Sequence, residues 1–377
     1  GYWISLPEQD EKYGRLILTN IGKTFSNKDL DLTMDIYLPQ NDSIQDRPLI
    51  MLIHGGGFFV GDKGSEEMVK LCNYFASLGY VAVSINYRMG FQLSKSSIEK
   101  CGFKATQDAH AAMRYLVAHQ DEYHLDPNLL FVGGASAGSI TTLNLVFMTN
   151  DLRPKGATRK RFAKEFGDIE ESGNHYKVDF HIKAIANLWG AVPNLKYLEN
   201  TPVSIISFHG DSDQVIPFDV GFPFSDIKGN LGELFFEKMY GAAAIHRKAK
   251  ELGLREELHV FHGAGHGPYQ DENGKLNNRF YFIQDKIANF FYNEITEGEY
   301  IIQDTVHPQY FVCSNKVEKI YWKIEGGIIL SSSHNKIKVA WFTDAPIRTL
   351  TVSGILKTGA HFQKTIKPNS PAILQPI

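Results

Sequence analysis

The feature that most constrains the fold is a repeated pairing of a short apolar segment with a glycine-rich turn. Such pairs follow one another along the first three quarters of the chain, and segments with helical spacing lie between them. Strands that alternate with helices of 10–15 residues are typical of a mostly parallel sheet with helices on both faces. The sequence therefore predicts an α/β fold in which polar, glycine-rich loops follow the strands.

Periodicity places the individual elements. Continuous or alternating apolar runs indicate strands, and apolar residues spaced three to four apart indicate helices. The expected strands cover residues 32–38, 49–53, 80–85, 129–133, 182–189, 203–209 and 258–262. The expected helices cover residues 66–78, 105–119, 139–148, 233–252 and 279–294. Two polar segments, 150–177 and 218–232, interrupt this rhythm, and we interpret them as loop insertions that shape a site.

The texture of the sequence changes after about residue 298. Segments 318–324, 337–342 and 349–352 alternate apolar and polar residues, and glycine and proline separate them. This period of two indicates short strands, and no segment there has helical spacing. We therefore expect two domains: a catalytic domain over residues 1–298 and a small all-β sandwich over residues 299–377 that contributes no chemistry.

The strongest chemical signal is the segment 134–138, which reads GASAG and fits the pattern G-x-S-x-G. It lies directly between an expected strand and an expected helix. A nucleophilic serine needs such a sharp turn, where only small neighbours fit. The turn places Ser136 at a helix N-terminus, where the helix dipole favours developing negative charge. We therefore interpret Ser136 as a catalytic nucleophile, and an idle serine in a glycine-rich turn is the alternative.

A second glycine-rich segment, HGGGF at 54–58, follows the expected strand 49–53. Attack on an ester carbonyl creates an oxyanion, and losing one backbone N–H donor that stabilises it costs roughly 3–4 kcal/mol. Consecutive glycines can present such donors without interference from side chains. We expect the oxyanion to be bound by the N–H groups of Gly56, Gly57 and Ala137.

Two further motifs supply an acid and a base. The segment 209–217 (HGDSDQVIP) follows the expected strand 203–209, and 263–267 (GAGHG) follows the strand 258–262. We expect Asp213 to orient the base, with Asp211 as the competing carboxylate, and His266 to be the base, with His262 as the alternative. The order serine, aspartate, histidine is that of the α/β-hydrolase arrangement and differs from the chymotrypsin and subtilisin orders.

With these motifs in place, residues 30–295 resemble the carboxylesterases and hormone-sensitive-lipase-like esterases of the α/β-hydrolase superfamily. The resemblance rests on HGGGFFVGD, SINYR, QDAHAAMRYL, DPNLLFVGGASAG, HGDSDQVIP and GAGHG. It implies an α/β-hydrolase fold and the same nucleophile, oxyanion loop, acid and base. One departure is Ser139, where many members have a second glycine, and we expect it to alter helix packing only. The segments YWKIEGGIIL and IKVAWF resemble PKD-like immunoglobulin-type domains of secreted bacterial enzymes.

The substrate class follows from charge and from the residues near the oxyanion loop. The net charge of -3 offers no basic field for nucleic acid. No motif for a metal, nucleotide or other cofactor occurs, and no apolar run is long enough to span a membrane. We expect Phe58, Phe59 and Tyr87 to contact the substrate in a modest acyl pocket. Because the insertion is short and polar, short acyl or carbohydrate-linked (acetyl or feruloyl) esters are favoured over long-chain lipids.

Several alternatives remain open at this level. A serine peptidase of the prolyl-oligopeptidase kind shares the sheet and the triad, and an inactive hydrolase domain could serve binding or adhesion. Cys72 and Cys101 could form a disulfide, although three unpaired thiols including Cys313 are favoured. The start at Gly1 fits either removal of a secretory segment or a chain shortened at its start. We expect a secreted, periplasmic or cell-surface location, and the oligomeric state is left open.

Overall fold

In the computed structural model, most of the chain can be described residue by residue. The described residues are 14–19, 32–39, 44–158, 166–170, 172–226, 231–296, 301–303, 307, 309–313, 317–333, 335–356 and 361–367. Residue 1, on which the expectation of a removed leader depends, and the predicted domain boundary between residues 298 and 299 both lie outside these ranges. That expectation and that boundary therefore stay predictions.

An eight-stranded sheet forms the centre of the molecule, in the order β1-β2-β4-β3-β5-β6-β7-β10. The strands from β4 to β10 pair in parallel, whereas β1 and β2 pair antiparallel at one edge. In chain order the strands are β1 (Gly14–Thr19), β2 (Thr33–Leu38), β3 (Arg47–Ile53), β4 (Val81–Ile85), β5 (Leu125–Ala135), β6 (Ile182–Leu188), β7 (Ser204–Gly210) and β10 (Glu256–Phe261). The predicted α/β fold class is confirmed.

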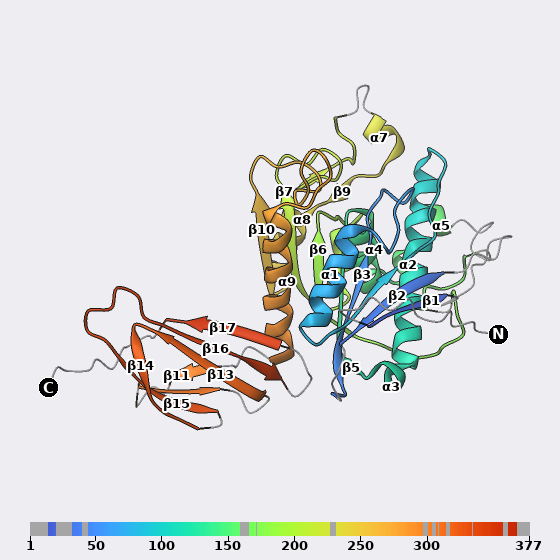
Figure 1. The fold of residues 1–377 in the computed structure, drawn as a ribbon. Coiled ribbons are helices and arrows are strands. Elements are labelled where there is room, and N and C mark those ends of the chain that lie inside the picture. The colour runs from blue at the N-terminus through green and yellow to red at the C-terminus, as the bar shows by residue number, and fades with distance from the viewer. Residues whose placement is uncertain are drawn as a thin grey trace.

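Helices cover both faces of this sheet (Figure 1). Successive side chains of a strand point to opposite faces, so Leu49, Met51 and Ile53 of β3 join one buried cluster and Ile50 and Leu52 join the other. The first cluster contains side chains of α2, α4 and α8, and the second contains those of α1 and α9. The helices are α1 (Glu66–Ser77), α2 (Lys95–Ala118), α3 (Gln120–Tyr123), α4 (Ala137–Phe147), α5 (Lys155–Thr158), α7 (Leu231–Phe235), α8 (Ala242–Glu251), α9 (Asn278–Thr296), and the 3₁₀ turns η1 (Asn150–Leu152) and η2 (Leu195–Glu199).

The segment 233–252 is mostly helical, as expected, but it is divided into two helices. The chain there forms α7, then β9 (Met239–Tyr240), which pairs with β8 (Val220–Gly221), and only then α8. Gly241 is the N-cap of α8, and an added Cβ there would lie 1.8 Å from the carbonyl oxygen of Pro217. The second helix therefore begins at a close contact between residues distant in sequence, which local periodicity does not report.

Helix α2 is longer than predicted, since it begins at Lys95 and not at residue 105. The side chain of Ser94 caps it by accepting a hydrogen bond from the N–H of Ser97 at 3.3 Å. The added turns matter for function because they reach the cavity described below.

The C-terminal part forms two small sheets, as expected of an all-β module. One sheet has the order β11-β12-β15-β14 and the other β13-β16-β17. Their buried centre contains Phe311, Ile337, Val339, Trp341 and Leu350. The strands are β11 (Ile301–Gln303), β12 (Tyr310–Cys313), β13 (Val317–Glu325), β14 (Gly327–Ser332), β15 (Lys336–Trp341), β16 (Thr349–Leu356) and β17 (His361–Ile366).

This module packs against the α/β part near α9 (Figure 1). Val317 and Val352 belong to the same buried cluster as Phe291 and Tyr292 of α9. The two parts of the chain therefore share apolar core, and we expect the module to stabilise the α/β part. The PKD-like resemblance of the module stays a prediction.

Two expectations about membrane and redox chemistry can be compared with the structure. In the described ranges, every helix is too short or too polar to cross a bilayer. Cys72, Cys101 and Cys313 are buried thiols that form no disulfide with one another, which agrees with the favoured interpretation.

Because the two parts share a core, two similar substitutions in the module should differ in their effect on the stability of the whole chain. Val352 is fully buried, whereas Ile347 is 54% exposed. Val352→Asp places an unpaired charge in the shared cluster and should destabilise the whole chain by about 3 kcal/mol or more. Ile347→Asp makes the same chemical change at the surface and should leave the melting temperature nearly unchanged. Equal melting temperatures for a folded Val352→Asp protein and for wild type would contradict the shared core.

Candidate active site

Ser136 lies at the turn between β5 and α4. Its backbone has φ 55° and ψ -120°, an unusual conformation for a residue with a side chain. The turn is tight because α4 approaches β3: an added Cβ on Gly138 would lie 2.1 Å from the carbonyl oxygen of Ile53, and one on Gly134 would lie 2.5 Å from Gly138. Glycine is therefore required at both positions, and the close approach holds Ser136 at the carboxyl edge of the sheet.

His266 contacts both Ser136 and Asp213. Its Nε2 lies 2.8 Å from the hydroxyl oxygen of Ser136, and its Nδ1 lies 2.7 Å from Oδ2 of Asp213. A carboxylate can only accept, so Nδ1–H donates to Asp213 and Nε2 is left to accept the serine proton. The structure thus brings together the three residues predicted as nucleophile, acid and base, from three different loops.

The carboxylate of Asp213 is buried but well satisfied. Its Oδ1 accepts the N–H groups of Val215 at 2.8 Å and Ile216 at 3.0 Å. Burial raises the pKa of this group, but hydrogen bonds from His209 and His266 outweigh that effect, so the pKa of Asp213 lies well below its usual value. Asp213 therefore stays ionised and can stabilise a protonated His266.

His209 is a site residue that the sequence analysis did not identify. It is fully buried at the end of β7, and its Nε2 lies 3.2 Å from Oδ2 of Asp213 and 3.2 Å from the carbonyl oxygen of Ile216. It thus contacts the same carboxylate oxygen that His266 contacts. Its position as the first residue of the 209–217 motif was the available signal, but its role depends on the fold of the loop.

Asp211 and His262, the alternatives for acid and base, contact each other. Oδ2 of Asp211 lies 2.8 Å from Nδ1 of His262, and Oδ1 accepts the N–H of Gly263 at 2.7 Å. The hydrogen bond from His262 lowers the pKa of Asp211, with a smaller contribution from Gly263. The pair lies at the surface and holds the loop that carries His266 against the loop that carries Asp213.

The oxyanion loop presents free backbone donors beside Ser136. Gly56 and Gly57 have φ 105° and 63°, and the carbonyl of Gly56 accepts the N–H groups of Phe59 and Val60, both at 3.0 Å. Within the described residues, the N–H groups of Gly56, Gly57 and Ala137 make no hydrogen bond to the protein. These are the three donors expected from the sequence, and they are free to bind an oxyanion.

Of the three residues predicted to contact the substrate, only Phe58 lines the cavity. Phe58 lines the cavity, but Phe59 is 65% exposed and stacks edge-on with Phe91. Tyr87 is buried behind the oxyanion loop and donates its hydroxyl to the carbonyls of His54 at 3.0 Å and Gly55 at 3.2 Å. Neither Phe59 nor Tyr87 is a lining residue of the cavity, so Tyr87 instead supports the loop.

A buried polar network lies beneath the turn that carries Ser136. Ser139 donates to Oδ1 of Asn187 at 2.6 Å, and the same oxygen accepts the N–H of Gly190 at 2.9 Å. Asn187 donates to Ser207 at 2.9 Å, and Ser207 contacts Nε2 of His246 at 2.7 Å. Ser139 is the residue that departs from the family pattern, and its hydroxyl joins α4 to β6 and β7.

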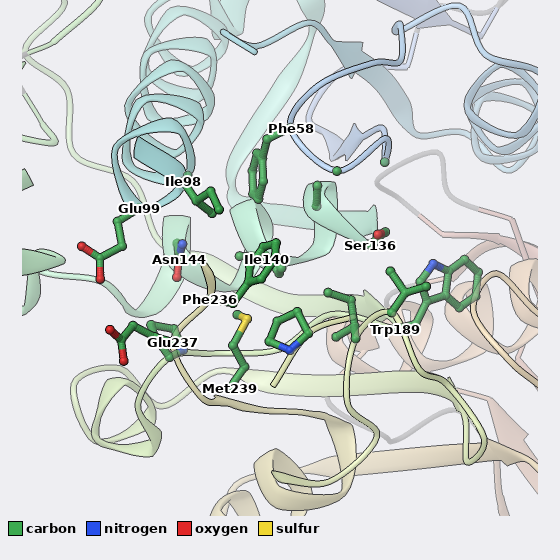
Figure 2. A pocket seen from close by; sticks show the side chains of 18 of the residues that line it. Phe58, Ile98, Glu99, Ser136, Ile140, Asn144, Trp189, Phe236, Glu237 and Met239 are labelled. Carbon is green, nitrogen blue, oxygen red and sulfur yellow. The ribbon is translucent and has the colours of Figure 1, made fainter. Parts of the chain in front are cut away.

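A cavity of about 1020 Å³ opens beside Ser136 (Figure 2). Its walls come from the oxyanion loop, the start of α2, α4, the segment 151–155 and the segment 235–240. Most of the side chains labelled in Figure 2 between Ser136 and Asn144 are apolar. They include Ile98, Ile140, Phe236 and Met239. The cavity is larger than the modest acyl pocket expected from the sequence. Its walls include the segments around residues 98 and 236, which the sequence alone could not place beside Ser136.

This arrangement can perform acyl transfer, which predicts different effects for the two aspartates. Asp213→Asn should leave the fold intact but lower kcat for a nitrophenyl ester by about a thousandfold or more, because an amide can hold His266 in the wrong tautomer. Asp211→Asn should lower kcat less than tenfold, since it only loosens a surface contact. The reverse ranking of the two variants in steady-state kinetics would reassign the acid.

Comparison with known proteins agrees with this geometry. Residues 34–201 match the BD-FAE family model. The chain is 27% identical over 132 residues to gut esterase 1 of Caenorhabditis elegans, a match that covers 34% of this chain and 23% of that protein. It is 24% identical over 236 residues to the probable carboxylic ester hydrolase LipM of Mycobacterium tuberculosis, covering 58% of this chain and 50% of that protein. The matches thus span between about a quarter and half of these relatives' lengths.

A solved structure gives a likeness over a longer region. The apo form of Thermogutta terrifontis esterase 2 superimposes with a TM-score of 0.50 at 22% sequence identity, covering 76% of this chain and 97% of that chain. At this identity the likeness concerns the fold. The sheet order, the strand-to-helix turn at Ser136 and this likeness show that the chain has an α/β-hydrolase fold.

Proposed function

We propose that the protein is a serine esterase that hydrolyses carboxylic esters through an acyl-enzyme on Ser136. The observation that carries this proposal is the continuous contact from Ser136 through His266 to Asp213, at 2.8 and 2.7 Å. The free N–H groups beside the same serine add the second requirement of acyl transfer, which is stabilisation of an oxyanion. The esterase names of the relatives support the same reaction class.

The first half of the reaction forms the acyl-enzyme. The hydroxyl oxygen of Ser136 attacks the ester carbonyl while Nε2 of His266 accepts its proton. The carbonyl oxygen becomes an oxyanion, which the N–H groups of Gly56, Gly57 and Ala137 bind at the N-terminus of α4. When the intermediate collapses, the C–O bond to the alcohol breaks, and His266 donates the proton to the departing alcohol.

The second half repeats these steps with water. Nε2 of His266 accepts a proton from a water molecule, whose oxygen attacks the acyl carbon. The same N–H groups bind the second oxyanion. Collapse of this intermediate breaks the bond to Ser136, which takes back a proton from His266, and the carboxylic acid leaves. Asp213 remains ionised throughout because its pKa is low, and it stabilises the imidazolium in both halves.

We propose esters of an extended, largely apolar or aromatic acyl group as substrates, with the carbohydrate-linked feruloyl type as the leading candidate. A cavity of about 1020 Å³ is at the upper end of the range of about 300–1,000 Å³ that is usual for ligand pockets, and an acetyl group would fill little of it. A secreted or cell-surface location would fit such a substrate and is proposed with it.

A fluorophosphonate probe tests the nucleophile. The probe should label wild type, and peptide mapping should locate the adduct on Ser136. Ser136→Ala should lose both the labelling and nearly all hydrolysis of nitrophenyl acetate. Ser77→Ala is the matched control, because Ser77 is exposed on α1 and donates only to the carbonyl of Tyr74. Labelling that survives Ser136→Ala unchanged would contradict the assignment.

A parallel assay distinguishes the esterase from a peptidase. We expect rapid hydrolysis of nitrophenyl acetate and no comparable hydrolysis of an aminoacyl nitroanilide. Loss of the ester activity in Ser136→Ala must accompany the first result, so that a background reaction is excluded. A higher kcat/KM for the anilide would favour the peptidase of the prolyl-oligopeptidase kind.

A further inference from the structure

Asn144 lies on the same face of α4 as the nucleophile. Ser136, Ile140 and Asn144 are spaced four residues apart, and this spacing aligns side chains along one side of a helix. At 1.5 Å per residue, the backbone of Asn144 is about 12 Å from that of Ser136. All three residues line the cavity, and Figure 2 shows Ile140 and Asn144 following one another away from Ser136. The helix thus forms one wall of a channel that leads from the nucleophile.

The amide of Asn144 is buried without a partner. The residue is 4% exposed, and within the described residues neither its Oδ1, which the protein covers, nor its Nδ2 makes a hydrogen bond. Its neighbours on α4 behave differently, since Thr141 donates to the carbonyl of Ala137 and Thr142 to that of Gly138, both at 2.9 Å. A buried polar group without a partner costs about 1–3 kcal/mol. Such a cost at a cavity wall suggests that the partner comes from a bound molecule.

The surroundings define what this partner can be. Between Ser136 and Asn144 the channel is bordered by apolar side chains, including Ile98, Ile140 and Met239. A ligand that reaches Asn144 must therefore be mostly apolar along its length and polar at its end. Burying a terminal charge there would be costly unless it were paired.

Charged side chains of both signs line the cavity. Glu99 and Glu237 do so, and Figure 2 draws both on the same side of the view as Asn144. Each already has a protein partner: Glu99 accepts the N–H of Gly156 at 2.6 Å, and Glu237 pairs with Lys95 at 3.4 Å. Lys95, Arg153, Lys155 and Lys238 line the same cavity, so a terminus of either charge would meet like charges there. An uncharged hydroxyl avoids this repulsion and can accept a hydrogen bond from Nδ2 of Asn144.

We propose that Asn144 is a specificity-determining residue that binds a hydroxyl group at the far end of an extended, mostly apolar part of the ester substrate. The proposal rests on the proposed esterase function and names the substrate feature that its cavity selects. A site built to hydrogen-bond a hydroxyl discriminates against the analogue that lacks it, because the buried amide then stays unpaired. We expect the hydroxyl to raise kcat/KM about tenfold relative to that analogue.

Matched ester pairs test this inference on both sides of the scissile bond. On the acyl side, nitrophenyl esters of ω-hydroxy acids are compared with those of unsubstituted acids, from hexanoyl to decanoyl. On the alcohol side, monoacetates of linear α,ω-diols are compared with alkyl acetates over the same lengths. The measured quantity is the ratio of kcat/KM within each pair. In one of the two series, the wild-type ratio should reach about ten at the chain length that spans the channel.

The variant Asn144→Leu keeps the approximate size of the side chain and removes the amide. Its ratio should fall to one or below, because the terminal hydroxyl would then face an apolar group. Ile140→Val is the matched control, since it changes the shape of the same helix face without changing its polarity, and it should retain the wild-type ratio. A ratio that Asn144→Leu and Ile140→Val change equally would overturn the assignment to the amide.

The wild-type data alone can overturn the proposal, even where a variant does not fold. Ratios near one at every length in both series would show that no hydroxyl is bound, and Asn144 would then hold only water. The failure of the proposed function is distinguishable from this outcome. If nitrophenyl acetate is not hydrolysed at all, the esterase function fails. If it is hydrolysed but no pair is discriminated, only the role of Asn144 fails.

Discussion

The close approach of α4 to β3 is the constraint on which the site depends. The helix can begin directly after β5 only because Gly134 and Gly138 leave room for the backbone, including the carbonyl of Ile53. This contact forces Ser136 into a left-handed backbone conformation that costs energy of the order of 1–3 kcal/mol. The surrounding sheet, through the hydrogen bonds from Ser139 to Asn187 and from Asn187 to Ser207, holds that conformation in place.

Once Ser136 is fixed, the parallel sheet brings the remaining groups to it. In such sheets the loops after the strands meet at the carboxyl edge, which is where binding sites form. The loop after β3 supplies free N–H groups, the loop after β7 supplies Asp213, and the loop after β10 supplies His266. Further contacts then fix the distances: His209 at the end of β7 contacts Oδ2 of Asp213, and Asp211 holds the loop of His266 through the N–H of Gly263.

The catalytic groups could be predicted from sequence because each is encoded locally. A strand followed by a glycine-rich turn is readable without tertiary information, and the order of Ser136, Asp213 and His266 supplied the rest. The cavity could not be predicted in the same way. Its walls come from segments such as 235–240, where the pairing of β9 with β8 interrupts the helical segment through a contact distant in sequence.

The roles of individual side chains were also hard to predict from sequence, because they depend on tertiary contacts. Tyr87 was expected at the substrate because it is aromatic and close in sequence to the right strand, yet its hydroxyl supports the oxyanion loop. Asn144 gave no signal, since an asparagine in a helix is ordinary until its neighbours are known to leave its amide unpaired. Periodicity indicated the all-β module, but not that Val352 shares a core with α9.

Rapid-quench mass spectrometry of the reaction with a slowly hydrolysed ester tests the central claim most directly, because it observes the covalent intermediate itself. During the first turnover, the acyl mass should accumulate to about one per protein molecule on the peptide that carries Ser136. It should then decay at the steady-state rate of hydrolysis. Turnover of the ester without an acyl mass on that peptide, or with the mass on another residue, would contradict the account.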